Sequence, residues 1–385
     1  MAEDLIIYTP MYVTFFWAAV LLITKRENNR AKFFLGVFML AAFLLYFSHA
    51  VFFKRIISVY FVFDTIYMFS SLTVYPLYYW YIKLLTVETK YQTYNIRMLL
   101  PAFLFSAISL TLYLLMSENE RAAYFTVYFT KSKTEVTFSS LMQYQKINFI
   151  AGRLIFTVQV FFFLYFGRML VKNYQKKIEN FYSNLESRSV LWVKILLYSL
   201  VITSLMSIIF NVIGRSFFMG SKTLLIFPSA IFSVLLFLIG FLGYLQNHTV
   251  IDLEIDEEKN NSDLNLKNYN TVKLNEKLLN LFKDEAIYKN PDLKITQVSE
   301  LLNTNRTYIS KHINTEFGCT FSDFVNRYRV EEAKRLLTSE TSKNYSLNYI
   351  SEKSGFGSMG SFMRVFREFE DITPGQYREK NIKSD

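Results

Sequence analysis

The chain has 385 residues, 42 Lys and Arg against 32 Asp and Glu, and a hydrophobic content of 52%. This length allows two or three domains. The single cysteine, Cys319, excludes an internal disulfide framework, and the three histidines lie far apart and match no metal-ligand spacing. No arrangement of acid, base and nucleophile indicates an enzyme, and we expect no cofactor.

The charges are unevenly distributed along the chain. Residues 1–248 hold 22 Lys and Arg against 10 Asp and Glu, whereas residues 249–385 hold 20 against 22. The net positive charge therefore comes from short loops between apolar runs, which favours a membrane protein over a basic nucleic-acid arm. We predict a transmembrane sensor domain over 1–248, a linker with a short amphipathic helix over 249–287 and a soluble domain over 288–385.

Seven runs in the first domain have about the 20 mostly apolar residues that a helix needs to cross the hydrocarbon core of a bilayer. They cover residues 5–24, 33–53, 56–82, 98–116, 149–171, 191–213 and 223–246. The first run lacks a basic n-region and a small-residue cleavage site, so we expect it to remain as a signal anchor. The sequence therefore predicts a seven-helix transmembrane bundle.

The loops between these runs predict the orientation of the bundle. One alternating set of loops holds 12 Lys and Arg, and the opposite set holds 8. The positive-inside rule assigns the richer set to the cytoplasm. We therefore expect the N-terminus outside the cell and residues from 247 onward inside it.

Polar side chains within the spans are the candidate sensor. This predicted polar cluster consists of His49, Asp64, Arg153, Gln159 and Asn211. An unpaired charge within the bilayer is unfavourable, so Asp64 is expected to face the bundle interior with Arg153 as its partner. One hypothesis is an outward-facing, polar-lined pocket for a signal molecule. The alternative is that Asp64 and Arg153 form a structural pair, and that Arg153 and His49 extend toward the membrane interface.

The residues after the last span change abruptly in composition. Residues 247–268 are acidic and rich in asparagine, which is typical of a solvated linker. Leu278, Leu279, Leu281 and Phe282 then recur at helical spacing. We predict a short helix there that packs against the following domain.

Residues 295–314 predict a helix-turn-helix. One apolar stripe ends at Leu302, the sequence NTN interrupts it, and a second stripe begins at Ile309. Asn305 is suited to cap the second helix, because its side chain accepts from a backbone N–H of the next turn. The second helix of such a unit fits the major groove of DNA. Together with Asn305, the candidate DNA-binding residues on it are Arg306, Thr307, Ser310, Lys311 and Asn314.

The same plan recurs after a longer predicted helix over 321–338. A short helix bearing Ile350 is followed by Gly355, which can adopt a positive φ, and by Phe356, which we expect in the core. Gly357 and Ser358 are candidates for the next N-cap. The candidate DNA-binding residues of this second unit are Ser358, Met359, Met363, Arg364 and Arg367.

These motifs together resemble a known family. The elements NPDLKITQVSELL, RTYISKHIN, NRYRVEEAKRLL, ISEKSGF, SFMRVFRE and TPGQYR follow one another between Tyr288 and Arg378. In this order and spacing they resemble the C-terminal DNA-binding domain of the AraC/XylS transcription regulators. The resemblance implies an all-helical domain of seven helices in which the helix bearing Val330 and Ala333 joins two helix-turn-helix units. The whole chain also resembles a subgroup of that family with a multi-span membrane domain in front.

Two pairs of residues depart from the family pattern. Met359 and Gly360 stand where relatives usually have polar residues, so we expect fewer base-directed hydrogen bonds from the second unit. Glu370 and Asp371 stand where an apolar residue or Thr and then Gly are more usual. The first unit is therefore the better candidate for reading sequence.

Other charges in this domain have plainer interpretations. Residues 289–385 hold 15 Lys and Arg against 13 Asp and Glu, so non-specific attraction to phosphate should be weak and sensitive to salt. Lys334 and Arg335 on the joining helix are interpreted as surface charges. Cys319 is interpreted as a small buried residue rather than a redox sensor.

The complete expectation is an all-α, membrane-bound, one-component transcription regulator of the bacterial inner membrane, whose DNA binding responds to a signal sensed in or across the membrane. The expected partners are double-stranded DNA, the lipid bilayer, RNA polymerase, an unidentified small-molecule or protein signal, and a second copy of the chain in a homodimer. Two alternatives stay open. The membrane half could be only an anchor or a surface for a partner membrane protein, or it could be a transporter module fused to the regulator.

Overall fold

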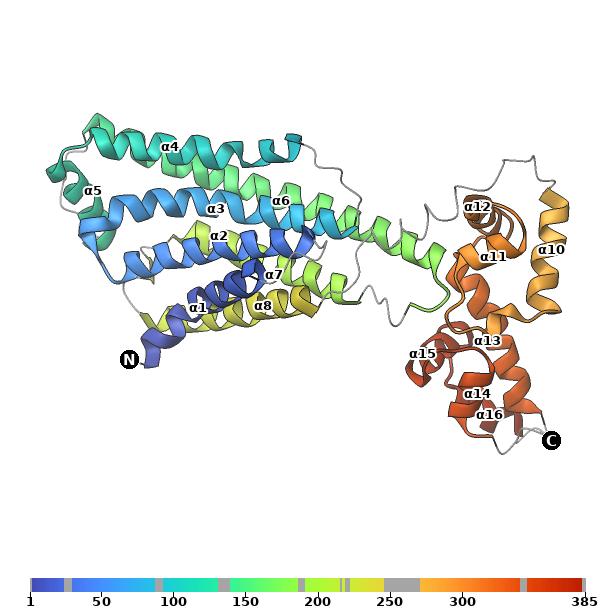
Figure 1. The fold of residues 1–385 in the computed structure, drawn as a ribbon. Helices are drawn as coiled ribbons and strands as arrows, with labels where there is room; N and C mark the ends of the chain where they lie inside the picture. The colour runs from blue at the N-terminus through green and yellow to red at the C-terminus, as the bar shows by residue number, and fades with distance from the viewer. Residues whose placement is uncertain are drawn as a thin grey trace. The chain divides into compact units, whose positions relative to one another are not determined.

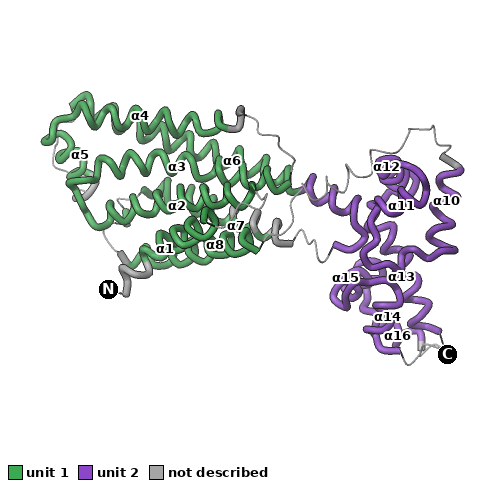
Figure 2. The backbone as a smooth tube through the Cα atoms, in the orientation of Figure 1, with its two compact units in different colours: residues 1–171, 192–250 green, residues 172–191, 251–385 purple. Residues whose placement is uncertain are grey.

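The structure is a computed structural model in which the described residues are almost entirely helical (Figure 1). These residues are 2–23, 30–86, 93–130, 139–185, 191–214, 217–218, 222–245, 271–339 and 345–382. Contacts divide the chain into two compact units, coloured separately in Figure 2. The first comprises Met1–Val171 and Trp192–Val250, and the second comprises Lys172–Leu191 and Ile251–Asp385. Residues 172–191 therefore belong with the second unit, although the predicted first domain included them.

The first unit is a bundle of long helices. They are α1 (Ala2–Ile23), α2 (Arg30–Phe53), α3 (Ile57–Thr86), α4 (Leu100–Leu115), α5 (Glu118–Thr130), α6 (Ser140–Phe181), α7 (Leu191–Ile213) and α8 (Ile226–Leu245), with short 3-10 turns η1 (Thr93–Leu99) and η3 (Lys222–Leu225). Helix α2 packs against α1 and α3, α1 packs against α8, and α3 packs against α4. The last turns of α6 belong to the second unit.

Five segments among the described residues are long and apolar enough to cross a membrane. They are Arg30–Phe53, Ile57–Thr86, Ile96–Leu115, Ser140–Phe181 and Thr223–Leu245. They coincide with the second, third, fourth, fifth and seventh predicted spans. Two shorter apolar helices, Ile7–Ile23 and Val201–Ile213, lie where the first and sixth spans were predicted. Length and composition thus support five spans, and the count of seven stays a prediction.

Close packing holds α8 against its neighbours. A β-carbon at Gly240 would overlap the ring of Trp17 on α1, and one at Gly243 would overlap Leu35 on α2. Small residues at such positions let helix backbones approach closely, as they do in membrane bundles. The ammonium group of Lys32 donates to the carbonyl oxygen of Tyr244 at 2.8 Å, and this hydrogen bond pairs a carbonyl in the last turn of α8.

The second unit is a compact set of shorter helices. They are α10 (Thr271–Lys283), α11 (Ile295–Leu301), α12 (Arg306–Glu316), α13 (Phe321–Thr338), α14 (Leu347–Lys353), α15 (Met359–Glu370) and α16 (Pro374–Ile382), with the 3-10 turn η4 (Ile287–Lys289). Helix α10 buries Leu278 and Phe282, and the Phe282 ring meets Phe324 of α13 with centroids 4.9 Å apart. The predicted packing of this helix on the following domain is confirmed. Residues 249–270 of the predicted linker lie outside the described residues.

Helix α13 contributes to two neighbouring cores. Phe321, Phe324 and Val325 in its first half are buried. Its second half belongs to a single hydrophobic cluster with α14 and α15, formed by Val330, Ala333, Leu337, Ile350, Phe356, Phe362, Val365 and Phe366. The helix bearing Val330 and Ala333 therefore joins the two helix-turn-helix units, as the resemblance implies. Phe356 lies in the core, as predicted.

Candidate nucleic-acid interface

The two helix-turn-helix units have the same turn geometry. Asn303 and Gly355 occupy equivalent positions after α11 and α14, with φ angles of 51° and 85°. The next residue in each turn closes the same backbone hydrogen bond. Thr304 N donates to Ser299 O at 2.9 Å, and Phe356 N donates to Ser351 O at 3.0 Å. The predicted left-handed turn at Gly355 is confirmed, and the first unit uses asparagine there, a residue that tolerates this conformation.

Both second helices begin at a capped N-terminus. Asn305 Oδ1 accepts from Thr307 N at 2.8 Å, and Ser358 Oγ accepts from Ser361 N at 3.1 Å. These bonds satisfy donors that a helix leaves unpaired in its first turn. The predicted N-caps at Asn305 and Ser358 are confirmed. We call α12 and α15 the reading helices from here on.

The candidate DNA-binding side chains form a partly exposed set on the reading helices. Those that are exposed are Thr307, Lys311, Asn314, Arg364 and Arg367, and those that are half-buried are Asn305, Arg306, Ser310, Ser358, Met359 and Met363. Asn314 and Arg364 also have local partners on their own helices. Asn314 Nδ2 donates to Ser310 O at 2.8 Å, and Arg364 Nη1 lies 3.3 Å from a carboxylate oxygen of Glu368. Both contacts are solvent-accessible, so replacing either of them by a contact to a phosphate or a base edge costs little free energy.

The end of the second reading helix explains one departure from the family pattern. Asp371 follows α15 with φ 60° in the left-handed region. Aspartate adopts this conformation more readily than most non-glycine residues, and so it can replace glycine in the turn. Lys334 of α13 lies 3.0 Å from Glu370, and this ion pair joins the end of α15 to the helix between the two units.

Arg329, which the sequence analysis did not single out, is the central polar residue of this domain. Its side chain is 1% exposed. It donates to the carbonyl oxygens of Tyr288 at 2.8 Å and Asn290 at 2.7 Å, and to Ser183 Oγ at 3.1 Å. Burial lowers the pKa of the Arg329 guanidinium to about 10, so it remains charged at neutral pH. The guanidinium therefore forms hydrogen bonds with three groups that lie far from it in sequence.

Cys319 is half-buried, and burial raises the pKa of its thiol. A raised pKa keeps the thiol protonated at neutral pH, which makes it a poor nucleophile. The predicted burial of Cys319 is therefore only partial.

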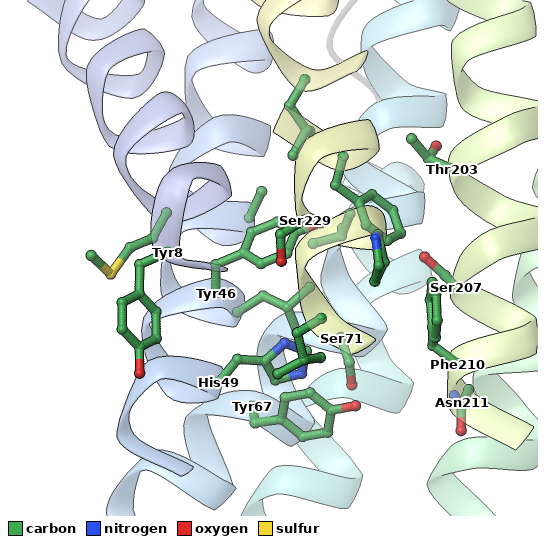
Figure 3. A pocket seen from close by; sticks show the side chains of 18 of the residues that line it. Tyr8, Tyr46, His49, Tyr67, Ser71, Thr203, Ser207, Phe210, Asn211 and Ser229 are labelled. Atoms are coloured by element: carbon green, nitrogen blue, oxygen red, sulfur yellow. The ribbon is translucent and has the colours of Figure 1, made fainter. Parts of the chain in front are cut away.

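The first unit contains a cavity of about 170 Å³ between α1, α2, α3, α6, α7 and α8. Figure 3 shows its polar side chains around the space, with His49 and Tyr67 close together and Ser207 and Asn211 on one helix. The lining is otherwise aromatic and aliphatic. Its hydroxyl, imidazole and amide groups belong to Tyr8, Tyr46, His49, Tyr67, Ser71, Tyr75, Tyr78, Thr203, Ser207, Asn211 and Ser229. None of the described lining residues is Asp, Glu, Lys or Arg.

The cavity includes only part of the predicted polar cluster. His49 and Asn211 line it, whereas Asp64, Arg153 and Gln159 are not among the lining residues. Arg153 Nε donates to Asn211 Oδ1, so it orients an amide that lines the cavity. Gln159 is half-buried on α6.

The prediction that Asp64 pairs with Arg153 is wrong. Its carboxylate accepts hydrogen bonds from Tyr60 Oη at 3.1 Å and from Tyr113 Oη at 2.7 Å, and Asp64 is 4% exposed. Arg153 instead bonds to Asn211. The two phenol hydroxyls supply donors to this buried carboxyl group from α3 and α4. Asp64 therefore joins α3 to α4 beside the aromatic cluster of Phe52 and Phe125, and the five polar residues do not form one site.

Two helix-turn-helix units that share one long helix define the class of this C-terminal domain, and comparison with known proteins agrees. Residues 298–380 match the family described as "Helix-turn-helix domain". The chain is 34% identical over 89 residues to the uncharacterized HTH-type transcriptional regulator YtdP of Bacillus subtilis, and 33% identical over 89 residues to the xylose operon regulatory protein of Escherichia coli. These alignments cover 23% of this chain, and 11% and 22% of the respective relatives.

A solved structure also aligns with this region. It is the C-terminal domain of the two-component response regulator yesN from Fusobacterium nucleatum, at 29% identity, with 28% of this chain and 98% of that chain covered and a TM-score of 0.25. The C-terminal domain of this chain is an AraC-type helix-turn-helix domain. The chain spans about a tenth to a fifth of the length of the curated relatives named above, all within this domain.

Proposed function

We propose that this protein is a membrane-bound transcription regulator that reads DNA with α12 and α15. The observation that carries the proposal is the pair of capped reading helices attached to a single joining helix, each with exposed polar or basic side chains. A duplex presents successive major grooves about one helical turn apart, which is the spacing that paired recognition helices use. Its expected partners are double-stranded DNA and RNA polymerase, with a homodimer as the expected oligomer.

Replacing Lys311 by alanine is expected to weaken binding of the full-length protein to its operator about ten-fold. Lys311 is exposed on the first reading helix, where a lysine contributes a phosphate or guanine contact. The operator duplex would come from a genomic map of DNA bound by the full-length protein, and affinity would be measured by fluorescence anisotropy at two salt concentrations. The matched control is Lys277→Ala, an exposed lysine on α10. Equal affinities for the two variants would contradict the assignment of α12 as a reading helix.

The membrane location is part of the same proposal. The five apolar helices of sufficient length support insertion. With the seven predicted spans, the loop charges support an outside N-terminus and the second unit in the cytoplasm of a bacterial cell. Reporter fusions at residue 2 and residue 385 test this orientation. A cytoplasmic N-terminus together with an external C-terminus would contradict the proposed orientation.

The cavity supports a sensing role for the first unit rather than anchoring alone. A cavity of about 170 Å³ that is lined by rings and aliphatic groups can hold a small organic molecule, since an apolar cavity of about 150 Å³ is known to bind benzene. The uncharged lining disfavours ions, and the hydroxyl and amide groups offer hydrogen bonds to one polar substituent. The signal is then an uncharged, mainly apolar molecule of about eight non-hydrogen atoms with a hydrogen-bonding group.

Filling the cavity tests this ligand class. We expect 4-methylphenol to raise the melting temperature of the detergent-purified protein, and benzoate of similar size to leave it unchanged. Ser71→Leu places a larger side chain in the cavity and should abolish the response. Ala107→Leu on the exposed face of α4 is the matched control and should preserve it. A shift that Ser71→Leu does not reduce would assign the effect to detergent or lipid, and no shift in the parent protein would contradict the proposed ligand class.

A further inference from the structure

The residues that end helix α6 are packed into the second unit. We call residues 181–184 the α6 end. Tyr182 forms an isolated antiparallel bridge with Lys294, and Ser183 N donates to Leu293 O at 3.1 Å. Ser183 Oγ also donates to Leu293 O at 2.7 Å and accepts from Arg329 at 3.1 Å.

The backbone acceptor of Ser183 also bonds within the same domain. The carbonyl oxygen of Ser183 accepts from Ser322 Oγ at 3.3 Å. Ser183 is 1% exposed, and Phe181 and Tyr182 are also buried. A residue whose backbone and side-chain groups are bonded as completely as those of Ser183 is part of the domain's packing, because each buried polar group left unpaired would be unfavourable.

The α6 end also contacts the starts of both reading helices. The guanidinium of Arg306, the first residue of α12, lies 5.5 Å from the centroid of the Phe181 ring. Gly357 lies two residues before α15, and a β-carbon built on it would collide with the side-chain amide of Asn184. One short segment therefore touches the N-terminal approach of α12 and that of α15.

These are the positions that a bound duplex needs. Recognition helices of helix-turn-helix units present their N-terminal residues to the DNA. A duplex that engages the starts of both reading helices covers the surface between them, where the α6 end lies. The Arg306 guanidinium, which stacks on Phe181, is one of the candidate DNA-binding groups. The contact holds the Arg306 side chain against the α6 end, and a duplex that replaces this segment would release the side chain for a phosphate or guanine.

We propose that the α6 end occupies the DNA-binding surface of its own chain and holds the C-terminal domain in a state with low DNA affinity. This inference rests on the proposed DNA-reading function and adds its regulation. Helix α6 also carries Phe156, which lines the cavity, and Arg153, which bonds to the cavity residue Asn211. The helix whose end blocks the reading surface thus also forms part of the cavity wall. DNA binding requires the α6 end to leave, and a ligand raises DNA affinity only by favouring the released state.

A reversible cross-link tests the proposal. The side-chain carbon Cγ of Asn184, whose place a cysteine Sγ would take, lies 3.5 Å from the position of a β-carbon on Gly357, and in a disulfide Sγ lies about 3 Å from the partner's β-carbon. The pair Asn184→Cys and Gly357→Cys would be introduced into full-length protein carrying Cys319→Ala, which removes the single native cysteine. Mass spectrometry of the joined peptides would establish bond formation, and anisotropy would measure affinity for the operator duplex.

We expect the oxidised protein to bind the duplex at least ten-fold more weakly than the reduced protein. Each single cysteine variant, treated with the same oxidant, should bind like the reduced double variant. Equal affinity of the oxidised and reduced forms would overturn the proposal, as would failure of the disulfide to form. If the reduced double variant and the parent protein both fail to bind the duplex, the DNA-reading function itself is wrong and the inference falls with it.

A variant that weakens the α6 end should act in the opposite direction. Phe181→Ala removes the ring beneath Arg306 and is expected to increase the affinity of the full-length protein for the duplex about five-fold, which corresponds to a cation–π contact of about 1 kcal/mol. Tyr165→Ala, an exposed aromatic deletion on the same helix, is the matched control. Unchanged or weaker DNA binding by Phe181→Ala, with Tyr165→Ala at the parent value, would count against a blocking role.

Discussion

Replacing Arg329 by alanine is expected to destabilise the second unit by about 3–5 kcal/mol, because the substitution leaves buried acceptors without a donor. The guanidinium bonds to Tyr288 O, Asn290 O and Ser183 Oγ from a site that is almost completely buried. Arg329→Lys should recover only part of this stability. An ammonium on a flexible stem cannot reproduce the planar fork of donors.

Amide hydrogen exchange of the full-length protein measures this effect in place. We expect amides of α13 and α14 to exchange on the order of a thousand-fold faster in Arg329→Ala than in the parent protein. Arg327→Ala removes an exposed arginine from the same helix and should leave the exchange rates within a factor of about two. Rates in Arg329→Ala close to those of the Arg327→Ala control would mean that the three acceptors find other donors.

Gly355→Ala is expected to destabilise the same unit by about 3 kcal/mol. Two effects add. Gly355 has φ 85°, which is unfavourable for alanine, and an added β-carbon would lie 2.5 Å from Tyr288 O and 2.6 Å from Lys289 Cα. Because both obstructing atoms are backbone, the neighbouring chain has to shift to relieve the overlap.

Gly318→Ala separates the two effects. Gly318 also has a positive φ, 65°, but a β-carbon there meets nothing within 4 Å. Gly318→Ala should lower the free energy of unfolding by only about 1 kcal/mol, because only the unfavourable backbone conformation contributes. Urea unfolding followed by hydrogen exchange on the full-length variants compares them. Equal losses of stability in the two variants would show that the backbone near Tyr288 shifts with little loss of free energy.

Local features of the second unit were predictable from sequence. Asn305 and Ser358 could be assigned as N-caps, because their short polar side chains precede an apolar helical stripe and reach backbone N–H groups of the adjacent turn. Gly355 could be assigned to a left-handed turn for a similarly local reason. The family resemblance then supplied the connection through α13, which periodicity alone does not specify.

Long-range contacts were not predictable in the same way. Arg329 on an amphipathic helix is indistinguishable by type from its exposed neighbour Arg327, since its burial depends on Tyr288, Asn290 and Ser183 elsewhere in the chain. The packing of the α6 end against the C-terminal domain depends on contacts between residues more than a hundred positions apart.

The first unit shows the same limit. The prediction that Asp64 is buried is confirmed, but two tyrosines donate to it where an arginine was expected. The sequence of an apolar helix does not indicate which of its tyrosines will act as donors. The cavity arises where residues of six helices leave space between them, and spacing along any one helix does not encode that space.

The shared helix α13 has a consequence for the operator. Its two halves are buried in adjoining cores, and Lys334 ties its second half to the end of α15, so the separation between the two half-domains is built into one rigid rod. Adding one base pair between two half-sites turns the second groove by about 34° around the duplex axis. Within the described residues, the continuous helix α13 provides no hinge with which to follow such a rotation. Its target promoters should therefore share a single invariant spacer length, whatever the bases within it.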